Sequence, residues 1–483
     1  MPFRQFAVPL WRMYEEHLQH PIFSIIHGWA VEHSKRCYVV GGYVRDILLH
    51  RSSWDIDVVV EGDGIVLATF VASQLNPSPK VSVFKTYGTA HFVYDDREWE
   101  FVGARSESYA QNSRNPEVKP ATIEGDQLRR DFTINAMALS LGSDFGAFLD
   151  PFSGVVDLKA GIVRTPRDPD VTFSDDPLRM MRAVRFASRF GFEIDSKAFE
   201  SIRKHANRLS IVAPERIAEE LNKIMLHQKP SAGFRLLDMC GLLQLVLPEL
   251  HALKGVESRN GYMHKENFAH TLQVLDNVAT KSDSLWLRWA ALLHDIGKAP
   301  VKKFDKVRGW TFHGHDAVGA RMTKKLFRRL HLPQNEKMDF VSKLVALHLR
   351  PISLVEDGVT DSALRRLLFD AGDDLDELLA LAEADITSGN AVKVKQYMKN
   401  FANLRIKLLE TEDKDKVRNF QPPLSGEEIM MFFGIEPSRE VGIIKNSIKD
   451  AILDGLIGNN YDEAFAFMLQ KGSELGLVPA QKK

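Results

Sequence analysis

The chain has 483 residues, and its 63 Lys and Arg residues against 64 Asp and Glu residues give a formal net charge of −1. This balance excludes a uniformly basic nucleic-acid coat protein but leaves room for a nucleic-acid enzyme with local basic patches. With 44% hydrophobic and 26% charged residues, the composition excludes a largely disordered chain.

Several protein classes are disfavoured by simple sequence features. The length indicates about three domains, and the two cysteines, Cys37 and Cys240, are too few for a disulfide framework or a cysteine zinc site. No apolar run is long enough to span a membrane, and the first 33 residues are interrupted by Arg, Glu and His, unlike a signal peptide. We therefore expect a protein of the reducing cytoplasm without a membrane partner.

Short runs rich in β-branched and aromatic residues predict strands in the first part of the chain, at 37–40, 56–60, 81–84, 91–94 and 99–102. Residues 76–80 and 112–120 are predicted to be polar, proline-containing loops, and the polar stretch 103–125 has no evident core. Beyond Asp175 strand signals nearly vanish, and helical spacing of apolar residues is found at 177–190, 215–226, 269–279 and 285–294. The predicted fold is a multidomain α+β protein, with an α/β head followed by helical segments.

A glycine pair follows the first predicted strand. The segment Tyr38-Val-Val-Gly-Gly-Tyr-Val-Arg-Asp46 predicts a strand, a turn at Gly41 and Gly42, and a helix from about Tyr43. Free backbone N–H groups at such a turn make an anion site suited to a triphosphate.

Two aspartates lie on the next predicted strand, Trp54-Asp-Ile-Asp-Val-Val-Val60. Asp55 and Asp57 are two residues apart, so their carboxylates face the same side of a strand. Convergent carboxylates bind Mg²⁺, and two such ions would activate a 3′-hydroxyl and stabilise a leaving pyrophosphate. Glu100, on another predicted strand, is a candidate third carboxylate. The order of strand, Gly-Gly turn, helix and Asp-x-Asp strand resembles the nucleotidyltransferase superfamily that includes DNA polymerase β and poly(A) polymerases.

Three later segments narrow this resemblance to the bacterial class II tRNA nucleotidyltransferases. Leu128-Arg-Arg-Asp-Phe-Thr-Ile-Asn-Ala136 is similar to their RRDFTxNA motif, and Asp175-Asp-Pro-Leu-Arg-Met-Met-Arg-Ala-Val-Arg-Phe186 to their (E/D)DxxR element. Pro214-Glu-Arg-Ile-Ala-Glu-Glu-Leu221 is similar to their ERxxxE segment. The resemblance implies that tRNA, CTP and ATP are the partners and that Mg²⁺ is the cofactor of the head.

The same segments supply candidate nucleotide ligands. Arg129 and Arg130 can donate two hydrogen bonds each to phosphate oxygens, and Asp131 can accept one from a ribose hydroxyl. The family resemblance implies that nucleotide-binding residues also include Gly41, Gly42, Arg45 and Asn135. Arg182, Arg185 and Arg189 either hold the nucleotide or the RNA backbone, or form a solvated basic face.

Asp176 and Arg179 are candidates for base selection. They are three residues apart on a predicted helix and hence on one face. Asp accepts and Arg donates hydrogen bonds, which matches the amino group and ring acceptors of cytosine and adenine. Uracil and guanine present a carbonyl in place of that amino group. In the family that this chain resembles, such a pair replaces a nucleic-acid template.

A second set of motifs contains histidine and aspartate. The order His270, His294-Asp295 and Asp385 resembles the HD phosphohydrolase superfamily, and His315 and His348 match the extra histidines of members that can bind two metals. These ligands suit Mg²⁺, Mn²⁺, Ni²⁺ or a similar divalent ion, and Lys298 would help to hold a phosphate. The resemblance implies hydrolysis of a phosphate ester.

The resulting hypothesis is a nucleotidyltransferase that adds C and A to the tRNA 3′ end without a nucleic-acid template, with an additional HD phosphohydrolase activity. The predicted domains are an N-terminal helical extension (1–35), a nucleotidyltransferase head (36–141), a helical neck and body (142–255), an all-α HD domain (256–400) and a helical tail (401–483). Poly(A) polymerase, CC-only and A-only enzymes remain alternatives. An HD phosphohydrolase or RNA-binding regulator with an inactive head is the alternative of another class. The motifs leave the oligomeric state and the roles of the extension and tail open.

Overall fold

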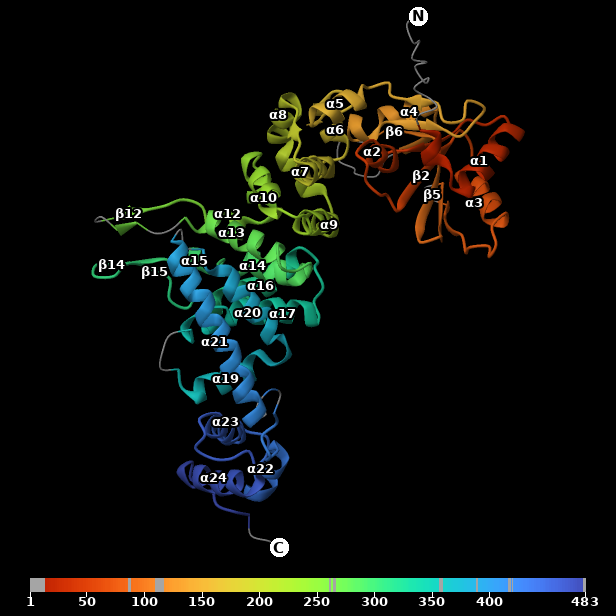
Figure 1. Cartoon of the computed structure of the whole chain (residues 1–483). Coiled ribbons are helices and arrows are strands. Elements are labelled where there is room, and N and C mark those ends of the chain that lie inside the picture. Colours follow the sequence, from red (N-terminus) through yellow and green to blue (C-terminus); the bar gives the residue numbers. More distant parts are fainter. Residues whose placement is uncertain are drawn as a thin grey trace, which may run out of the picture. The chain divides into compact units, whose positions relative to one another are not determined.

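The computed structural model describes residues 14–85, 88–108, 117–259, 262–263, 266–355, 359–387, 390–415, 418 and 420–480. The chain divides into two compact units, Met1–Pro248 and Glu249–Lys483 (Figure 1). Within the described residues, none of the helices combines the length and apolar character needed to cross a membrane.

The first unit contains a seven-stranded mixed sheet in the order β3-β4-β5-β2-β1-β8-β9. Its central strand, β2, pairs antiparallel with β1 and parallel with β5. The strands are β1 (Cys37–Val40), β2 (Asp55–Val60), β3 (Ser82–Phe84), β4 (Thr89–Tyr94), β5 (Arg97–Gly103), β8 (Ala138–Ser140) and β9 (Phe148–Leu149). All five predicted strands are thus confirmed, whereas β8 and β9 were not predicted.

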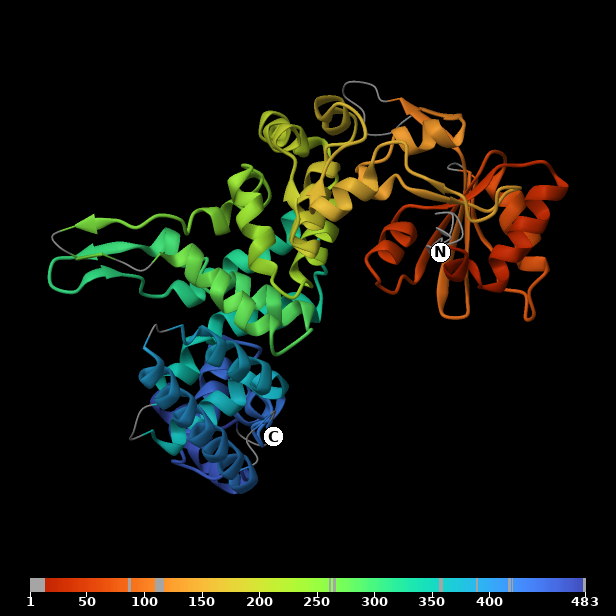
Figure 2. The same ribbon diagram turned by 45° about the horizontal axis from the view of Figure 1, so that its top comes forward.

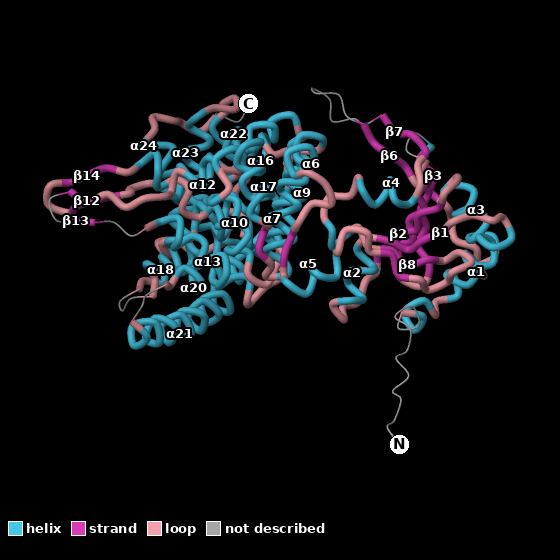
Figure 3. The backbone as a smooth tube through the Cα atoms, turned by 90° about the horizontal axis from the view of Figure 1, so that it is seen from above, coloured by secondary structure: helices cyan, strands magenta, loops and turns pink. Residues whose placement is uncertain are grey.

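Helices cover both faces of this sheet. Figure 3 shows α1 (Pro21–Glu32) and α3 (Gly64–Ser73) on one side and α2 (Gly42–Leu48) on the other. The 3₁₀ helix η2 (Glu15–Leu18) precedes α1. Fully buried aromatic side chains, among them Trp99 and Phe101 on β5, fill the core beside the sheet. The β-branched residues of β1 and β2 are buried on both faces, and this fixes β2 at the centre.

The polar stretch 103–125 contains a hairpin, which corrects the expectation of a loop without structure. β6 (Arg105–Ser108) pairs antiparallel with β7 (Glu117–Pro120), so the end of the predicted loop 112–120 is a strand. Residues 109–116, between the two strands, lie outside the described residues. The hairpin was missed because its strands are polar and do not alternate with apolar residues.

The rest of the first unit is mainly helical and surrounds α7 (Leu178–Phe190), which packs against α9 (Pro214–Met225) and α10 (Pro230–Met239). The predicted helices 177–190 and 215–226 are confirmed to within one residue at each end. The remaining elements are α4 (Ile123–Leu128), η4 (Thr133–Asn135), α5 (Gly154–Ala160), β10 (Ile162–Val163), α6 (Pro169–Asp175), β11 (Glu193–Ile194), α8 (Ser196–His205), η5 (Ala206–Ile211) and α11 (Leu243–Val246).

A buried ion pair holds α7 against α9. Arg185 Nε donates to Glu220 Oε2 at 2.6 Å, and both residues are buried. We expect Glu220→Ala to lower the free energy of unfolding by about 3–5 kcal/mol, because it leaves a buried guanidinium without its partner. Urea unfolding checks this, with Glu219→Ala, an exposed neighbour, as the matched control. Equal destabilisation by both variants would contradict the expectation.

The second unit is built from helices. They are α13 (Asn267–Ala279), α14 (Leu285–Leu293), α15 (Lys298–Val301), α16 (His315–Arg329), α17 (Glu336–Leu347), α18 (Leu349–Ser353), α19 (Asp361–Ala371), η6 (Gly372–Asp374), α20 (Leu375–Asp385), α21 (Ala391–Asp415), α22 (Gly426–Phe433), α23 (Arg439–Leu453) and α24 (Tyr461–Glu474), and the boundary between the units falls in α12 (Pro248–His251). The predicted helices 269–279 and 285–294 correspond to α13 and α14.

Two hairpins correct the expectation that this part is entirely α-helical. β12 (Ser258–Arg259) pairs with β13 (Tyr262–Met263), and β14 (Lys303–Asp305) pairs with β15 (Gly309–Thr311). Figure 2 shows both hairpins extending side by side from the helices, and β13 contacts β15. Their strands have only two or three residues each, which is too short for the alternation of apolar and polar residues that predicts a strand.

Candidate active sites

Acidic side chains gather at the start of β2 and on its neighbour β5. In the parallel register, Asp57 lies opposite Glu100 and Asp55 opposite Glu98. Because side chains alternate along a strand, Asp55, Asp57 and Glu100 share one face of the sheet, while Ile56 is buried on the other. The structure therefore places the three predicted carboxylates on one face of two neighbouring strands.

The surroundings of these carboxylates disfavour an unbalanced negative charge. Burial raises the pKa of Asp57, although the positive charge of Arg130 opposes this rise. Burial also raises the pKa of Glu100, and the neighbouring charge of Asp57 adds to the rise. Buried carboxylates whose pKa is raised further by a neighbouring carboxylate are suited to bind a divalent cation. The residues present thus fit a hard metal ion with oxygen ligands.

The glycine turn lies directly beside these carboxylates. Gly41 has φ +73°, a conformation that favours glycine, and α2 begins at Gly42. A Cβ atom at Gly41 would lie 2.9 Å from Arg130 Nη1 and 3.3 Å from Asp57 Oδ2. Only glycine therefore lets the backbone approach both the arginine and the carboxylate.

A carboxylate that sequence reasoning missed holds the two motif arginines. Asp126, on α4, is fully buried; its Oδ1 accepts from Arg129 Nε at 3.0 Å and its Oδ2 from Arg130 Nε and Nη2 at 3.1 and 3.0 Å. Burial would raise the pKa of Asp126, but the two arginine charges hold it below its usual value. The signal available in the sequence was the spacing of Asp126, which lies three residues before Arg129 and four before Arg130, as in helical side-chain pairs.

We expect Asp126→Asn to reduce nucleotide transfer by about 100-fold, because a misplaced substrate-binding group can cost that much. The loss should appear mainly in KM for the nucleotide, since Arg129 and Arg130 remain present but are no longer held in position. Steady-state kinetics with Asp126→Glu as the conservative variant checks this. An unchanged KM in Asp126→Asn would contradict the positioning role.

Arg45 and Asn135, both predicted to contact the nucleotide, bond to each other. Arg45 Nη1 donates to Asn135 Oδ1 at 2.6 Å, and its Nη2 pairs with Asp46 at 2.7 Å. Asn135 Nδ2 donates to Asp131 Oδ1 at 3.1 Å, and Asp131 Oδ2 pairs with Arg182 Nη2 at 2.6 Å. Burial would raise the pKa of Asp131, but Arg182 and Asn135 bring it to about 2. This network connects α2 with η4 and α7.

The structure corrects the expectation that Asp176 and Arg179 lie on one helix. α7 begins at Leu178, and Asp176 precedes it with an extended backbone, its Oδ1 accepting from the Leu178 N–H at 3.1 Å. Asp176 pairs with Arg216 at 3.5 Å rather than with Arg179. Arg179 donates through Nη2 to the Arg129 carbonyl at 2.8 Å, and its buried Nη1 has no hydrogen-bond partner among the described residues.

The remaining arginines of α7 have different surroundings. Arg182 pairs with Asp131, and Arg185 is buried against Glu220, whereas Arg189 is exposed at the end of the helix. Only Arg189 therefore belongs to a solvated face. The pairing of Arg185 with the Glu-containing segment of α9, and of Arg216 with Asp176, was not foreseen, although both partners lie in the ERxxxE segment.

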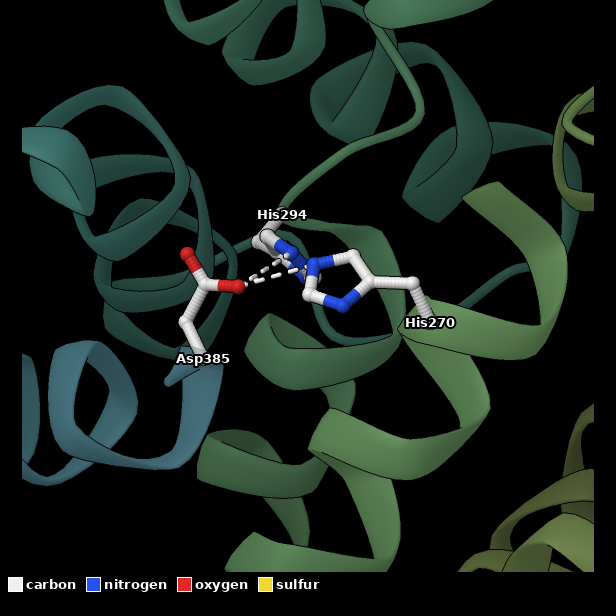
Figure 4. A group of neighbouring side chains, drawn as sticks. All are labelled: His270, His294 and Asp385. Carbon is white, nitrogen blue, oxygen red and sulfur yellow. Dashed lines mark ion pairs between the residues drawn. The ribbon is translucent and has the colours of Figure 1, made fainter. Parts of the chain in front are cut away.

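The second unit brings all six predicted histidine and aspartate ligands into one cluster. Figure 4 shows three of them, His270 from α13, His294 at the end of α14 and Asp385 at the end of α20, pointing toward one another. Asp385 Oδ1 lies 2.8 Å from His270 Nε2 and 3.7 Å from His294 Nε2. These three ligand atoms lie close enough together to hold one metal ion.

A second group of three adjoins the first. Asp295 Oδ1 lies 3.4 Å from His315 Nε2 and 3.9 Å from His348 Nε2, and the two histidine nitrogens are 3.4 Å apart. Asp295 Oδ2 lies 3.3 Å from His294 Nε2, so it links the two groups. Lys298, predicted to hold a phosphate, forms an ion pair with Asp295 Oδ2 at 2.6 Å.

Backbone carbonyls orient three of these imidazoles. The Nδ1 atoms of His294, His315 and His348 lie 2.7–2.9 Å from the carbonyl oxygens three residues earlier in the chain. A carbonyl only accepts, so Nδ1 carries the proton and Nε2 offers its lone pair to the cluster. His270 Nδ1 is oriented instead by Thr387 Oγ1, at 2.9 Å, a partner that sequence reasoning missed.

The pKa shifts in the cluster differ from ligand to ligand: burial would lower the pKa of His294, but the charge of Asp295 raises it. Burial lowers the pKa of His348 to about 4, which keeps its ring neutral at neutral pH. Burial would raise the pKa of Asp385, but the hydrogen bond from His270 and nearby histidines bring it to about 2. Neutral imidazoles and ionised carboxylates are the forms that bind divalent ions. The residues present thus fit one or two such ions.

Comparison with protein-family models divides the chain into three matched regions. Residues 37–164 match the poly A polymerase head domain, and residues 191–254 match the probable RNA and SrmB-binding site of polymerase A. Residues 267–389 match the HD domain. Together with the clustered carboxylates, these matches define a nucleotidyltransferase joined to an HD domain.

Curated relatives narrow this class to one family. The A-adding tRNA nucleotidyltransferase of Deinococcus radiodurans is 31% identical over 74% of this chain and 81% of its own length. The multifunctional CCA protein of Shewanella frigidimarina is 33% identical over 75% and 86%, and that of Neisseria gonorrhoeae is 37% identical over 62% and 70%. The chain belongs to the tRNA nucleotidyltransferase family.

Solved structures share the fold over almost the whole chain. A complex of a CCA-adding enzyme with ATP superposes with a TM-score of 0.61 at 20% identity, covering 96% of this chain and 98% of that one. The Thermotoga maritima CCA-adding enzyme complexed with tRNA gives a TM-score of 0.58 at 21% identity, with the same coverage. The fold predicted from the sequence, a polymerase-β-like head followed by helical segments and an HD domain, is therefore confirmed.

Proposed function

We propose that the chain adds C and A to the 3′ end of tRNA from CTP and ATP without a nucleic-acid template. The observation that carries this proposal is the grouping of Asp55, Asp57 and Glu100 on one sheet face, beside the turn at Gly41 and the guanidinium of Arg130. The three carboxylates would hold Mg²⁺, which would favour attack by the RNA 3′-hydroxyl and departure of pyrophosphate.

The chain's own residues place the nucleotide. Arg129 and Arg130, fixed by Asp126, would bind its phosphates, and Asp131 would accept a hydrogen bond from its ribose. Arg45, Asn135 and Arg182 support Asp131 through the network described above. Their proposed role is therefore positioning, whereas Gly41 and Gly42 leave room for the phosphates.

Base selection is proposed for Asp176 and Arg179. Arg179 Nη1 is buried without a partner among the described residues, so a base acceptor would satisfy it. The Asp176 carboxylate would accept from the amino group of cytosine or adenine. Uracil and guanine offer a carbonyl at that place, which would leave the carboxylate facing another acceptor.

The relatives include both multifunctional CCA proteins and an A-adding enzyme, so the extent of addition needs a direct test. Three primers distinguish the cases: tRNA lacking CCA, tRNA ending in C, and tRNA ending in CC, each with labelled CTP or ATP alone. A CCA-adding enzyme takes CTP on the first two and ATP on the third. An A-adding enzyme would use ATP on the third primer and would not use CTP on any of them. A poly(A) polymerase would add ATP to all three primers.

We also propose a metal-dependent phosphohydrolase activity for the HD domain. The observation that favours it is the pair of adjoining ligand groups, one with His270, His294 and Asp385 and the other with Asp295, His315 and His348. A bound Mg²⁺, Mn²⁺, Ni²⁺ or similar ion would activate water against a phosphate ester. The substrates would be phosphorylated or cyclic-phosphate RNA 3′ ends, or nucleotides, with Lys298 assisting phosphate binding.

The domain arrangement and compartment complete the proposal. The extension is 1–35 and the transferase head is 36–141. The neck and body that select the base and bind RNA are 142–255, the HD domain is 256–400 and the tail is 401–483.

The buried free thiols of Cys37 and Cys240 support a reducing cytoplasmic compartment. The intact carboxylate group of the head argues against a regulator with an inactive head.

A further inference from the structure

Three guanidinium groups converge on one aromatic ring at the end of α7. The centroid of the Phe190 ring lies 5.0 Å from Arg45 Cζ, 5.1 Å from Arg51 Cζ and 5.2 Å from Arg189 Cζ. The ring is itself stacked on Phe186, with centroids 6.0 Å apart and an interplanar angle of 5°. The stacked rings of Phe186 and Phe190 therefore pack against the three guanidinium groups.

Only one of these three charges is balanced by the protein. Arg45 is buried and pairs with Asp46 at 2.7 Å. Arg51 and Arg189 are exposed, and neither has a carboxylate within ion-pair distance among the residues that the structure describes. Two uncompensated guanidiniums on one ring repel each other, and an anion bound between them removes that repulsion.

The position of these arginines separates them from the proposed triphosphate contacts. Arg51 follows the C-terminal end of α2, whereas Gly41 precedes its N-terminal end. Seven helical residues span about 10 Å, so Arg51 and the turn at Gly41 lie at opposite ends of α2. An anion held between Arg51 and Arg189 would therefore be distinct from a phosphate group bound at the Gly41 turn itself.

The connection that contains Arg51 leads directly to the carboxylates. Residues 49–54 connect α2 to β2, and Trp54 immediately precedes Asp55. The Trp54 side chain is 60% exposed, which is unusual for so large an apolar ring. Surfaces that bind single-stranded nucleic acid combine basic residues with exposed aromatic rings on which bases stack.

We propose that Arg51, Arg189 and Phe190, together with Trp54, form a binding surface for the single-stranded 3′ end of the RNA that is extended. The two guanidiniums bind backbone phosphates, and Trp54 stacks on a base close to the reacting end. A free nucleotide has no sugar–phosphate backbone that continues from one site to the other, and an acidic peptide has no bases to stack. This inference rests on the proposed function, because it supplies the RNA that the transfer reaction needs.

The test is direct binding of tRNA lacking its 3′ CCA to the full chain, measured by fluorescence anisotropy at several salt concentrations without nucleotide. We expect Arg51→Gln with Arg189→Gln to weaken binding about tenfold per residue at low salt. The slope of log affinity against log salt should fall by about 1.4, since each single-strand phosphate contact contributes about 0.7. Trp54→Ala should weaken binding with an unchanged slope, because it removes stacking and not charge.

Two controls make the outcome specific. Arg51→Lys with Arg189→Lys keeps the charge and should keep the wild-type slope. Arg321→Gln with Arg439→Gln removes two exposed charges from other helices and should leave binding unchanged. Equal loss in this control, or wild-type affinity and slope in the Arg51 and Arg189 variant, would overturn the proposal. Competition by CTP or an acidic peptide, without competition by single-stranded RNA, would overturn it as well.

The binding assay also separates this proposal from the proposed function. If the wild-type chain incorporates no nucleotide, the transfer function fails, and the anisotropy result still reports on the surface. If the wild-type chain incorporates nucleotide but the Arg51 and Arg189 variant binds RNA normally, the surface proposal alone fails.

Discussion

Replacing Asp57 with asparagine is expected to lower the rate of nucleotide addition at least about 1,000-fold, since a bound metal ion supplies several kcal/mol of transition-state stabilisation. Asparagine has nearly the shape of aspartate but lacks the charge that would hold the cation. Asp57 lies at the centre of the group, between Asp55 on its own strand and Glu100 on the next. Single-turnover addition of labelled CTP to tRNA lacking CCA measures the effect.

Glu98→Gln is the matched control for this substitution. Glu98 lies on β5, two residues from Glu100, but its carboxylate pairs with His91 at 3.2 Å. We expect its loss to change the rate less than about threefold, in line with the small energies of exposed ion pairs. Rates that fall equally in the Asp57 and Glu98 variants would contradict the assignment of Asp57 as a metal ligand.

Replacing His294 and Asp295 together with alanine is expected to abolish metal-dependent phosphatase activity and to spare nucleotide addition. His294 belongs to one ligand group and Asp295 to the other, so the double variant damages both. The transferase carboxylates lie in the other compact unit of the chain, and their activity should therefore persist. Hydrolysis of RNA with a 3′-phosphate or cyclic phosphate, together with bound metal measured by mass spectrometry, checks the expectation.

His331→Asn serves as the control for the HD variant. His331 is exposed after α16 with φ +51°, a conformation that asparagine tolerates. It should keep both metal content and phosphatase activity. Wild-type metal content in the His294 and Asp295 variant would contradict the metal site. Loss of both activities in that variant would instead indicate a structural role for the HD domain.

The parts of the fold that could be predicted are those in which local patterns repeat. Runs of β-branched residues predicted the five strands, and the two-residue period placed Asp55 and Asp57 on one face. The spacing of the histidines alone could not show that four different helices converge. The HD resemblance predicted that grouping, and the structure places all six side chains together.

The start of α7 at Leu178, after Asp176, could have been predicted better. Pro177 follows Asp176 directly, and the residue before a proline is disfavoured in the helical conformation. The observed extended backbone at Asp176, with the helix beginning at Leu178, agrees with this rule. The consequence is chemical, since the Asp176 side chain accepts from the Leu178 N–H and pairs with Arg216 rather than with Arg179.

Partners that lie far apart in sequence could not be predicted from spacing. Arg185 was predicted to hold the nucleotide or the RNA backbone, or to lie on a solvated basic face, yet it is buried against Glu220, 35 residues further on. Arg45 reads as a nucleotide ligand, yet it bonds to Asn135 across 90 residues. In both cases the motif identified a residue near the site, and only tertiary packing decides whether its side chain binds substrate or positions another group.

Intact mass spectrometry of the RNA product tests the central claim most directly. tRNA lacking CCA is incubated with the full chain, Mg²⁺, CTP and ATP together, and the mass added to the RNA is measured over time. The expected product carries two cytidylates and one adenylate and grows no further. An unchanged mass, or continued growth by adenylate alone, would contradict the proposal that this chain is a CCA-adding enzyme.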